Sequence, residues 1–414
     1  MVNVLVIGNG ARESALGRAF LQSEAVTTVY VAPGNAGMSL IGLEPVAISA
    51  SDFPALIDFA RKNVSLTFVG PEVPLAGGIV DAFQAAALPV FGPTKQLAQL
   101  ESSKTFAKQF MHAHNLPTAR SEHVDNLADA NAALADFGVP VVIKADGLAA
   151  GKGVTVAKDD DAAAAAIADL YANHANAPVL IEEFLSGQEA SVLAMFNGEK
   201  RVIFPLAQDH KRRFDADKGP NTGGMGAISP APQFTPDEIA QAQSLVDQTL
   251  AGMTEAGLVG NGVLYIGLIF TADGLKILEY NLRFGDPETQ VLMPQVTSDF
   301  YQLTVDLLAG KQPTLHLDGQ SYCGVVAASP QYPHAEPATL PVITPNRQQR
   351  NYWYPANVTS NGDSLQTTGG RVFTVVGSGT DIAAACAQAY TRLQPLAGAL
   401  TCRQDIGWHA ITPN

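Results

Sequence analysis

The first hundred residues alternate short apolar runs with glycine-rich turns and helix-compatible stretches. The apolar runs are VNVLVI (2–7), TTVYVA (27–32), LTFVG (66–70) and PVFGP (89–93). Runs of this length, separated by helical segments, predict a βαβα order and therefore a parallel sheet, in which ligands bind at the carboxyl ends of the strands. Three of these ends are rich in glycine and proline: GNG (8–10), APGNAG (32–37) and GPEVPLAGG (70–78). We therefore predict a binding site where the three loops converge.

The first loop, GNGARESAL (8–16), could bind more than one kind of phosphate. A strand, a tight turn and a helix start leave unpaired backbone N–H groups and the positive end of the helix dipole available to an anion. A dinucleotide site needs a third glycine where Glu13 stands, and an acidic residue at the end of the next strand, which instead ends in Ala32, Pro33 and Gly34. The sequence thus disfavours NAD and leaves open another phosphate, or a turn that binds nothing.

Composition excludes several classes of protein. With 414 residues, 47% of them hydrophobic, the chain can bury a large core, and its length predicts roughly two to three domains. A formal net charge of -14 argues against binding to nucleic acid or to an anionic membrane. The three cysteines include no C-x-x-C pair, so they support neither a disulfide framework nor a thiolate metal site and fit a reducing cytoplasm. The sequence begins without a basic leader and has no apolar stretch near about 18 residues, so we expect neither secretion nor membrane insertion.

A second unit begins near Ser102 and contains the glycine-rich segment PVVIKADGLAAGKGVTVA (140–157). The loop GLAAGKG lacks the spacing and the Ser or Thr of a P-loop, which leaves a strand-to-strand turn whose N–H groups can wrap phosphate oxygens, or a plain surface hairpin. Lys144 precedes this turn on an apolar strand, where a lysine usually needs an anionic partner. Downstream, IEEFLSGQE (181–189) could supply backbone and apolar contacts for an adenine and a carboxylate for its ribose.

Two further stretches carry charged side chains. In LEYNLRFGDPE (278–288), Glu279 and Asn281 are two residues apart on a predicted strand, so their oxygens project from one face and can share a hard cation. Arg283 falls on the same face if the strand continues. A salt-bridged strand is the alternative, and we favour the metal site. The loop DHKRRFDADKGPNTGGMGA (209–227) gathers basic residues in an acidic protein, which indicates an anionic ligand, although a solvated loop has the same pattern.

A third unit starts at about residue 323. It contains the strand-like runs GVVAAS and GGRVFTVVGSG (369–379), followed by the helix TDIAAACAQAY, which Thr380 or Asp381 caps. Its polar residues form no recognisable catalytic cluster.

Taken in order, these stretches and several others resemble the ATP-grasp superfamily, and within it the phosphoribosylamine-glycine ligases. The resemblance spans nearly the whole chain and rests on VLVIGNGARE, VAPGNAG, VGPEVPLAGG, FGPT, LESSKTFAK, VIKADGLAAGKGV, IEEFLSGQEAS, QDHKR, GPNTGGMGA, GVLYIGL, LEYNLRFGDPETQ, GGRV and RQDIGW. DHKR followed by GPNTGGMGA, together with NLRFGDPETQ, is specific to these ligases. The chain departs from the usual family sequence at Ala11, Ser14 and His409, where the family has glycine, histidine and arginine.

The resemblance implies an α/β fold in three parts. These are an N-terminal parallel-sheet (pre-ATP-grasp) domain over 1–103, an ATP-grasp domain over 104–316 with a lid at about 118–188, and a small α+β C-terminal domain over 323–414. The implied reaction joins glycine to 5-phosphoribosylamine through a glycyl phosphate and gives glycinamide ribonucleotide, ADP and phosphate, the second step of de novo purine biosynthesis. Mg²⁺ or Mn²⁺ is the implied cofactor, and ATP is the co-substrate.

Two alternatives stay open at this point: another ATP-grasp carboxylate-amine ligase, and a nucleotide-binding relative without catalytic activity. In either case we expect small-molecule ligands, a monomer, a cytoplasmic location, and no nucleic-acid or membrane partner.

The resemblance also implies roles for individual residues. For ATP it implies Lys104, Lys144, Gly147, Gly151, Lys152, Gly153, Glu182, Glu183, Phe184, Leu185 and Glu189. For phosphoribosylamine it implies Gly8, Asn9, Gly10, Arg12, Glu13, Gly34, Asn35, Gly70 and Glu72. We place glycine near Asp209, Lys211, Arg283 and Asp286. The implied metal ligands are Glu279 and Asn281. The expected catalytic residues are Lys104, Lys144, Asp209, Lys211 and Arg283.

Overall fold

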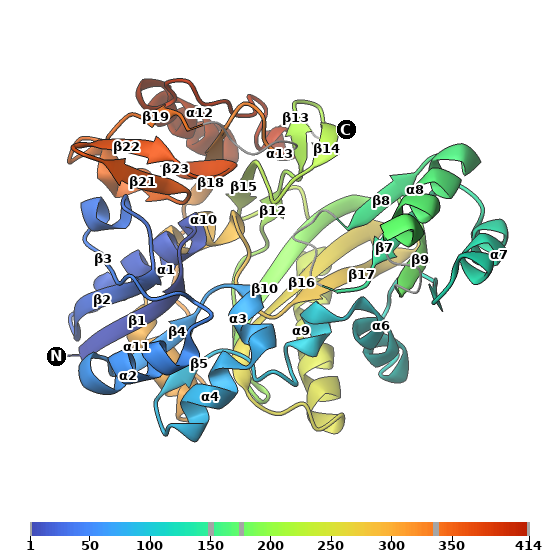
Figure 1. Ribbon diagram of the computed structural model, residues 1–414, viewed down its shortest axis with the longest axis horizontal. Coiled ribbons are helices and arrows are strands. Elements are labelled where there is room, and N and C mark those ends of the chain that lie inside the picture. Colours follow the sequence, from blue (N-terminus) through green and yellow to red (C-terminus); the bar gives the residue numbers. More distant parts are fainter. Residues whose placement is uncertain (1, 148–152, 174–177, 334–338, 412–414) are drawn as a thin grey trace.

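The computed structural model describes residues 2–147, 153–173, 178–333 and 339–411. Its N-terminal part is a parallel sheet with the strand order β3-β2-β1-β4-β5 (Figure 1). The strands are β1 (Val2–Gly8), β2 (Val26–Pro33), β3 (Glu44–Pro45), β4 (Leu66–Val69) and β5 (Val90–Phe91). The helices between them are α1 (Ala11–Leu21), η1 (Met38–Ile41), α2 (Phe53–Asn63), α3 (Glu72–Gly77) and α4 (Ile79–Ala85). The predicted βαβα order and parallel sheet are confirmed.

Side chains of β1 alternate between two cores, as the two-residue period of a strand requires. Val4 and Val6 pack in the core that also holds residues of α1, whereas Leu5 and Ile7 pack in the core that holds residues of α2 and α4. Both faces of the sheet are therefore covered, which explains why β1 reads as a continuous apolar run.

The glycine loops at the carboxyl end of the sheet lie side by side. The backbone N–H of Gly34 donates to the carbonyl of Gly8 at 3.0 Å, and that of Gly70 donates to the carbonyl of Ile7 at 3.1 Å. The predicted convergence of the three loops at one sheet edge is therefore confirmed.

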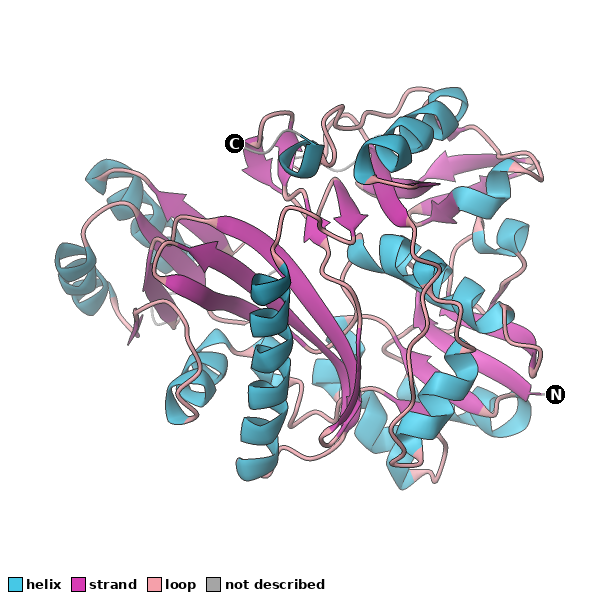
Figure 2. Ribbon diagram, turned by 180° about the vertical axis from the view of Figure 1, so that it is seen from behind, coloured by secondary structure: helices cyan, strands magenta, loops and turns pink. Residues whose placement is uncertain are grey.

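The central part contains two antiparallel sheets. The larger has the order β11-β10-β16-β17 and the smaller the order β6-β9-β7-β8. Their strands are β6 (Ser121–Val124), β7 (Val141–Ala145), β8 (Val154–Ala157), β9 (Val179–Glu183), β10 (Gln188–Asn197), β11 (Lys200–Ile203), β16 (Asn261–Thr271) and β17 (Gly274–Asn281). The helices are α5 (Gln99–Ser102), α6 (Lys104–Ala113), α7 (Leu127–Phe137), α8 (Asp160–Asn173) and α9 (Pro236–Glu255). Helix α9 packs along the larger sheet (Figure 2), and α7 and α8 cover the smaller one.

The C-terminal part is built on a sheet with the order β12-β15-β18-β23-β20, beside a smaller sheet with the order β19-β22-β21. Its strands are β12 (Gln208–Asp209), β13 (Arg212–Phe214), β14 (Lys218–Asn221), β15 (Gly226–Ser229), β18 (Ser321–Ala328), β19 (Pro341–Val342), β20 (Trp353–Pro355), β21 (Val358–Asn361), β22 (Ser364–Thr367) and β23 (Arg371–Gly379). The helices are η3 (Gln349–Tyr352), α12 (Ile382–Leu393), η4 (Gln394–Leu396) and α13 (Trp408–Ile411). Asp381 caps α12, because its Oδ1 accepts a hydrogen bond from Ala384 N at 2.8 Å.

The basic segment 209–227 is not an irregular loop throughout, because parts of it form strands. It contributes β12, the hairpin of β13 and β14, and the start of β15. Strand β15 pairs with β18, and Met225 and Ile228 are buried in the C-terminal core. Strands from within the predicted central unit therefore complete the sheet of the C-terminal unit.

The chain also returns to the N-terminal part after β17. The elements α10 (Glu288–Leu292), η2 (Met293–Gln295) and α11 (Phe300–Leu308) pack against α1. The ring of Phe300 lies 4.8 Å from that of Phe20 and 6.1 Å from that of Phe68. Phe284 adds a ring 6.2 Å from Phe68. A single aromatic cluster thus joins the N-terminal and central parts.

Candidate active site

A buried carboxylate, Glu182 on β9, lies between two lysines. Its Oε2 is 2.5 Å from Nζ of Lys144 on β7, and its Oε1 is 3.0 Å from Nζ of Lys108 on α6. Lys144 Nζ also donates to the carbonyl of Leu278 on β17 at 3.4 Å. Glu182 is thus the anionic partner that the apolar strand around Lys144 predicted, and Lys144 links the smaller sheet to the larger one.

Sequence reasoning assigned no role to Lys108. Its side chain is buried, and Nζ donates to Thr118 Oγ1 at 2.7 Å and to the carbonyl of Ala119 at 3.0 Å. Burial lowers the pKa of Lys108, and the carboxylate of Glu182 opposes that effect. A signal was available, because Lys108 follows Lys104 by four residues on one helix and so shares its face.

Lys104 supports the start of the predicted lid loop. Its Nζ donates to the carbonyls of Ala145 and Gly147, both at 2.8 Å, and its backbone N–H donates to Asp146 Oδ1 at 2.6 Å. Burial lowers the pKa of Lys104, and Asp146 opposes the shift.

Strands β7 and β8 pair as the expected hairpin around this loop. Of the loop residues predicted to bind ATP, Gly147 and Gly153 are described, and the carbonyl of Gly153 accepts from Ala145 N at 2.9 Å. Gly151 and Lys152 lie outside the described residues.

The predicted adenine segment follows Glu182 directly. Glu183 Oε1 accepts a hydrogen bond from the backbone N–H of Arg120 at 2.8 Å and lies 3.2 Å from Nζ of Lys276 on β17. Burial would raise the pKa of Glu183, but these two donors hold it below its ordinary value. Phe184 is 42% exposed and Leu185 is partly exposed, so apolar surface is available at the junction of the two sheets.

A charged cluster forms where β12 lies beside β10. It contains Asp209 at the end of β12, Lys211 in the link between β12 and β13, and Glu189 on β10. Lys211 Nζ lies 3.0 Å from Glu189 Oε2 and 3.5 Å from Asp209 Oδ1. Burial raises the pKa of Asp209 to about 7, against the effect of Lys211 and with a further contribution from Glu288. Although burial alone would lower the pKa of Lys211, Asp209 and Glu189 hold it well above its ordinary value. Asp209 and Lys211, which were predicted to bind the substrate glycine, are therefore in contact. Glu189, the predicted acceptor for the ribose of ATP, is paired with Lys211.

Glu279 and Asn281 lie on one face of β17, as predicted. They pair with Gly267 and Tyr265 of β16, and the carboxylate of Glu279 is exposed. Asn281 Oδ1 accepts a hydrogen bond from Arg283 Nη2 at 3.4 Å, so Arg283 is on this side of the strand too. The described residues contain no group of three or more His, Cys, Asp and Glu side chains placed to hold a metal ion. A carboxylate and an amide oxygen still suit a hard cation that takes its other ligands from phosphate and water.

Glu288, like Lys108, is a charged residue to which sequence reasoning assigned no role. It is buried at the start of α10, and its Oε1 accepts from Tyr265 OH at 3.0 Å and from Ser191 Oγ at 3.3 Å. Its negative charge raises the pKa of Asp209, which places Glu288 near the cluster of Asp209, Lys211 and Glu189. The segment GDPETQ contained this residue, but spacing alone did not distinguish it from a helix-start acid.

Arg283 connects the central part to the N-terminal part. Its Nε lies 3.3 Å from Glu72 Oε2 at the start of α3 and 3.1 Å from Glu101 Oε1 on α5. Burial would raise the pKa of Glu72, but Arg283 and Arg12 hold it below its ordinary value. Glu72, predicted for phosphoribosylamine, and Arg283, predicted for glycine, are thus in direct contact.

The first glycine loop is built around Glu13. The carboxylate of Glu13 accepts from Gly10 N at 2.7 Å and from Arg12 Nε at 2.6 Å. A Cβ on Gly8 or Gly70 would lie within about 2.5 Å of the Glu13 side chain, so these glycines make room for it. Glu13 therefore shapes the loop, and its carboxylate already accepts the N–H of Gly10.

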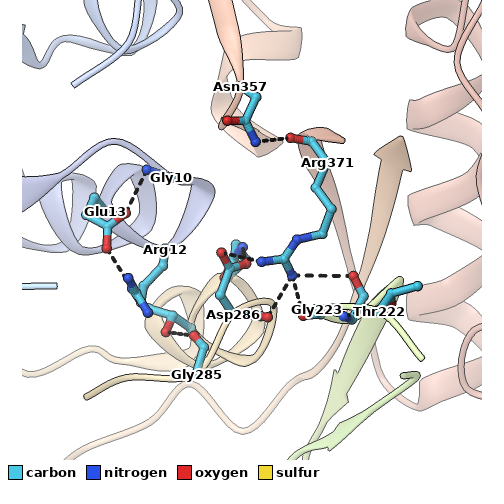
Figure 3. Close-up of polar contacts among 12 residues, drawn as sticks. Gly10, Arg12, Glu13, Thr222, Gly223, Gly285, Asp286, Asn357 and Arg371 are labelled. Atoms are coloured by element: carbon cyan, nitrogen blue, oxygen red, sulfur yellow. Dashed lines mark hydrogen bonds and ion pairs between the residues drawn. The ribbon is translucent and has the colours of Figure 1, made fainter. Parts of the chain in front are cut away.

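A cavity of about 80 Å³ opens where this loop meets the other two parts. Asn9, Gly10, Asp286, Asn357 and Arg371 are among the residues that line it. Figure 3 shows Arg371 reaching from β23 toward Asp286, with Gly10 on the opposite side. All three parts of the chain therefore contribute to one cavity.

Arg371 is held by several contacts in this cavity. Its Nη2 lies 3.0 Å from Asp286 Oδ2, and its Nη1 donates to the carbonyls of Asp286 at 2.8 Å and Gly223 at 2.5 Å. Asp286 Oδ1 also accepts from Gln290 at 2.7 Å. The structure thus groups Asp286 with Gly10 of the loop predicted to bind phosphoribosylamine. It also gives the third unit a polar cluster that we did not expect. The signal was Arg371 within GGRV, a charged residue at the start of an apolar strand.

Asn35 fixes the second glycine loop in the same region. Its Nδ2 donates to the carbonyls of Asn9 at 2.8 Å and Pro355 at 3.3 Å. Ser14, which departs from the family sequence, donates its hydroxyl to the same Pro355 carbonyl at 2.6 Å. His409, another departure, lies 2.9 Å from Asp217. Ser14 therefore links the N-terminal and C-terminal parts, and His409 links the last helix to the turn between β13 and β14.

Comparison with known proteins follows the same three parts. The sequence model of phosphoribosylglycinamide synthetase matches the chain as an N domain at residues 2–101, an ATP-grasp (A) domain at 102–289 and a C domain at 322–409. The chain belongs to the phosphoribosylglycinamide synthetase family. The predicted resemblance and the α/β fold with N-terminal, ATP-grasp and C domains are confirmed.

Individual relatives agree with the family assignment. The chain is 47% identical to a phosphoribosylamine-glycine ligase of Lactococcus lactis subsp. lactis, over 99% of this chain and 100% of the relative. It is 44% identical to that of Halalkalibacterium halodurans, over 99% and 97% of the two chains. The crystal structure of a phosphoribosylamine-glycine ligase from Thermotoga maritima superposes with a TM-score of 0.84 at 32% identity, over 98% of this chain and 100% of that one.

Proposed function

We propose that this chain joins glycine to 5-phosphoribosylamine at the expense of ATP and releases glycinamide ribonucleotide, ADP and phosphate. Membership of the family identifies the chain as an ATP-grasp ligase of purine biosynthesis. The observation that carries the assignment of the site is Arg283. One guanidinium contacts Asn281, beside the nucleotide end of the site, and Glu72, in the N-terminal part. The nucleotide end of the site and the predicted phosphoribosylamine end therefore lie next to each other, as an acyl transfer between them requires.

The first chemical step brings two anions together. The carboxylate of glycine attacks the γ-phosphorus of ATP, the bond from that phosphorus to the β–γ bridging oxygen breaks, and ADP leaves with the electron pair, which gives glycyl phosphate. Lys104 and Lys144 supply positive charge for the phosphates, and Glu182 orients the ammonium of Lys144. Glu279 and Asn281 would hold a divalent cation, which neutralises phosphate charge when it is bound.

The cluster on β12 suits glycine, which carries one charge of each sign. Lys211 offers an ammonium for the carboxylate of glycine, and Asp209 offers a carboxylate for its amino group. The pKa of Asp209, about 7, keeps a share of this group neutral in the free protein at neutral pH. Glu189 Oε2 lies 3.0 Å from Lys211 Nζ, and its other carboxylate oxygen can accept a hydrogen bond from a ribose hydroxyl.

The cavity around Arg371 suits phosphoribosylamine. A guanidinium recognises a phosphate by parallel N–H donors, and Asn9 and Asn357 line the same space with amide groups. The amine of the bound substrate attacks the carbonyl carbon of glycyl phosphate, the bond from carbon to the phosphate oxygen breaks, and phosphate leaves. No protein nucleophile is required. The smaller sheet, which carries Lys144 and Glu182, covers the nucleotide end and limits access of water to the acyl phosphate.

An ADP-release assay tests this function. With ATP, Mg²⁺, glycine and freshly made phosphoribosylamine, we expect steady release of ADP that stops when either co-substrate is omitted. ADP release that does not depend on glycine would contradict the ligase assignment. A different carboxylate that replaces glycine would favour another ATP-grasp carboxylate-amine ligase.

We also propose Mg²⁺ as the working metal ion, with Mn²⁺ as a substitute, and a monomer in the cytoplasm that acts on small molecules alone. None of the helices in the described ranges combines the length and the apolar character that crossing a membrane requires. Light scattering at increasing protein concentration measures the oligomeric state, and a dimer would contradict the expected monomer.

A further inference from the structure

A second cavity lies at the seam between the N-terminal and C-terminal parts. Its volume is about 300 Å³, and it shares no lining residue with the cavity around Arg371. It is lined by Arg18 of α1, Leu40 and Ile41 of η1, and Arg347, Arg350 and Asn351 around η3. Three guanidinium groups from two parts of the chain therefore border one space that the reaction above does not use.

These three arginines form no ion pair within the described residues, as is also true of Arg212, Arg213 and Arg392, which donate to backbone carbonyls. What distinguishes the three is that they line one cavity together. Ion pairs to carboxylates are made by Arg12, Arg61, Arg120, Arg201, Arg283, Arg371 and Arg403. Within the part of the chain that the structure describes, no ion pair joins Arg18, Arg347 or Arg350 to an acidic side chain. Acidic residues outnumber basic ones by 39 to 25, so a group of arginines without counter-charge goes against the composition of the chain.

Two of the guanidinium groups are held in place without being neutralised. Arg18 Nη1 donates to the carbonyl of Arg350 at 2.7 Å, and the Arg18 guanidinium lies over the ring of Tyr354 at 5.2 Å. Arg350 Nε donates to the carbonyl of Pro345 at 3.2 Å. Each guanidinium has five N–H groups, so most donors of this cluster remain available to a ligand.

We infer that this seam cavity is a binding site for a small phosphorylated metabolite. Arg18, Arg347 and Arg350 bind its phosphate, since planar N–H donors match phosphate oxygens and the dianion supplies the missing negative charge. Leu40 and Ile41 contact its carbon frame. The volume is at the lower end of the range of small-molecule sites and the hollow is open to solvent, so it has room for a small metabolite.

The arginines come from both sides of the seam, so a bound phosphate holds the N-terminal and C-terminal parts together. The same two parts also form the cavity around Arg371. A ligand in the seam cavity therefore stabilises the arrangement of domains that the active site needs.

Calorimetric titration of the full chain with inorganic pyrophosphate tests this site. Arg347→Ala removes one guanidinium that makes no other ion pair, and we expect it to weaken pyrophosphate binding at the seam by roughly tenfold. Arg61→Ala is the matched control, because Arg61 is an exposed arginine of α2 paired with Asp58 at 3.5 Å, and we expect wild-type binding. ADP release should be the same in all three proteins, since neither arginine belongs to the active site.

Crystals soaked in tungstate, a phosphate-like dianion, locate the site directly. We expect an anomalous peak between Arg18 and Arg347 in the wild-type protein that disappears in Arg347→Ala. Tungsten found only at the active site, or equal pyrophosphate binding by the wild type and Arg347→Ala, would overturn the inference. Binding of an acidic peptide but not of pyrophosphate would overturn it as well.

Discussion

Replacing Glu182 by glutamine removes the negative charge between Lys108 and Lys144 and keeps the shape of the side chain. In the native protein Glu182 is 3% exposed and lies 2.5 Å and 3.0 Å from the two ammonium groups. Removing one partner of a buried ion pair costs about 3–5 kcal/mol, because a charge is left buried without a counter-charge. We expect Glu182→Gln to lower the free energy of unfolding by this amount at pH 7, and to raise the KM for ATP because Lys144 loses its orientation.

The loss of stability depends on pH with a defined sign. Burial lowers the pKa of Lys108 in the native protein, and Glu182 opposes this shift. Without Glu182, Lys108 binds a proton less readily in the folded chain than in the unfolded chain, whose lysines titrate near ~10.4. Because the unfolded chain then holds more protons, the free energy of unfolding rises with pH up to that value. The penalty of Glu182→Gln should therefore shrink as the pH increases from 7 toward about 10.

Urea unfolding followed by circular dichroism measures both effects. The neighbouring Glu183→Gln is the matched control, since Glu183 is partly exposed and pairs with Lys276 at 3.2 Å. We expect Glu183→Gln to cost about 1 kcal/mol or less, as exposed ion pairs do. Equal losses for the two variants, or a loss for Glu182→Gln that does not change with pH, would refute the reasoning.

Three further variants test separate parts of the site. Glu279→Ala should abolish Mg²⁺-dependent ADP release and leave the thermal midpoint unchanged, because this carboxylate is exposed; normal turnover would exclude Glu279 as a metal ligand. The pKa of Asp209 is about 7, and we propose that its ionised form binds the amino group of glycine, so kcat/KM for glycine should fall about tenfold per pH unit below 7. Asp209→Asn should be slower and lose this dependence, and an unchanged pH profile would contradict its role. Arg371→Lys cannot reproduce the forked contacts to Asp286, so KM for phosphoribosylamine should rise roughly tenfold while KM for ATP stays constant; equal changes in both constants would argue against a substrate contact.

Local patterns in the sequence predicted the elements that have a regular hydrophobic period or that end at glycine or proline. The apolar runs and glycine turns gave the N-terminal parallel sheet and the meeting of its loops near Gly8 and Gly70. The two-residue spacing of Glu279 and Asn281 placed both on one strand face. An apolar strand around Lys144 predicted a buried anionic partner, which is Glu182. These features depend on neighbours in the sequence, so they can be read from it.

Features that depend on distant pairing could not be predicted in this way. The segment with Lys211 looked like a basic loop because its strands are short and one of them, β15, pairs with β18, about a hundred residues later in the chain. The enclosure of Glu13 could not be predicted either, because the glycines around it come from separate loops. Lys108 and Glu288 occupy helix positions where a charged residue is usually solvated, and only the tertiary structure buries them.

Because β12 and β15 belong to the sheet of the C domain, a gene segment that encodes only residues after them does not encode the whole sheet. Residues 322–409 match the family as one domain, yet the sheet in which they fold contains strands from more than ninety positions earlier. A gene fragment that encodes only this carboxyl-terminal stretch would leave the edge of β18 unpaired along a buried strand. Recombination at that junction would thus transfer an incomplete sheet.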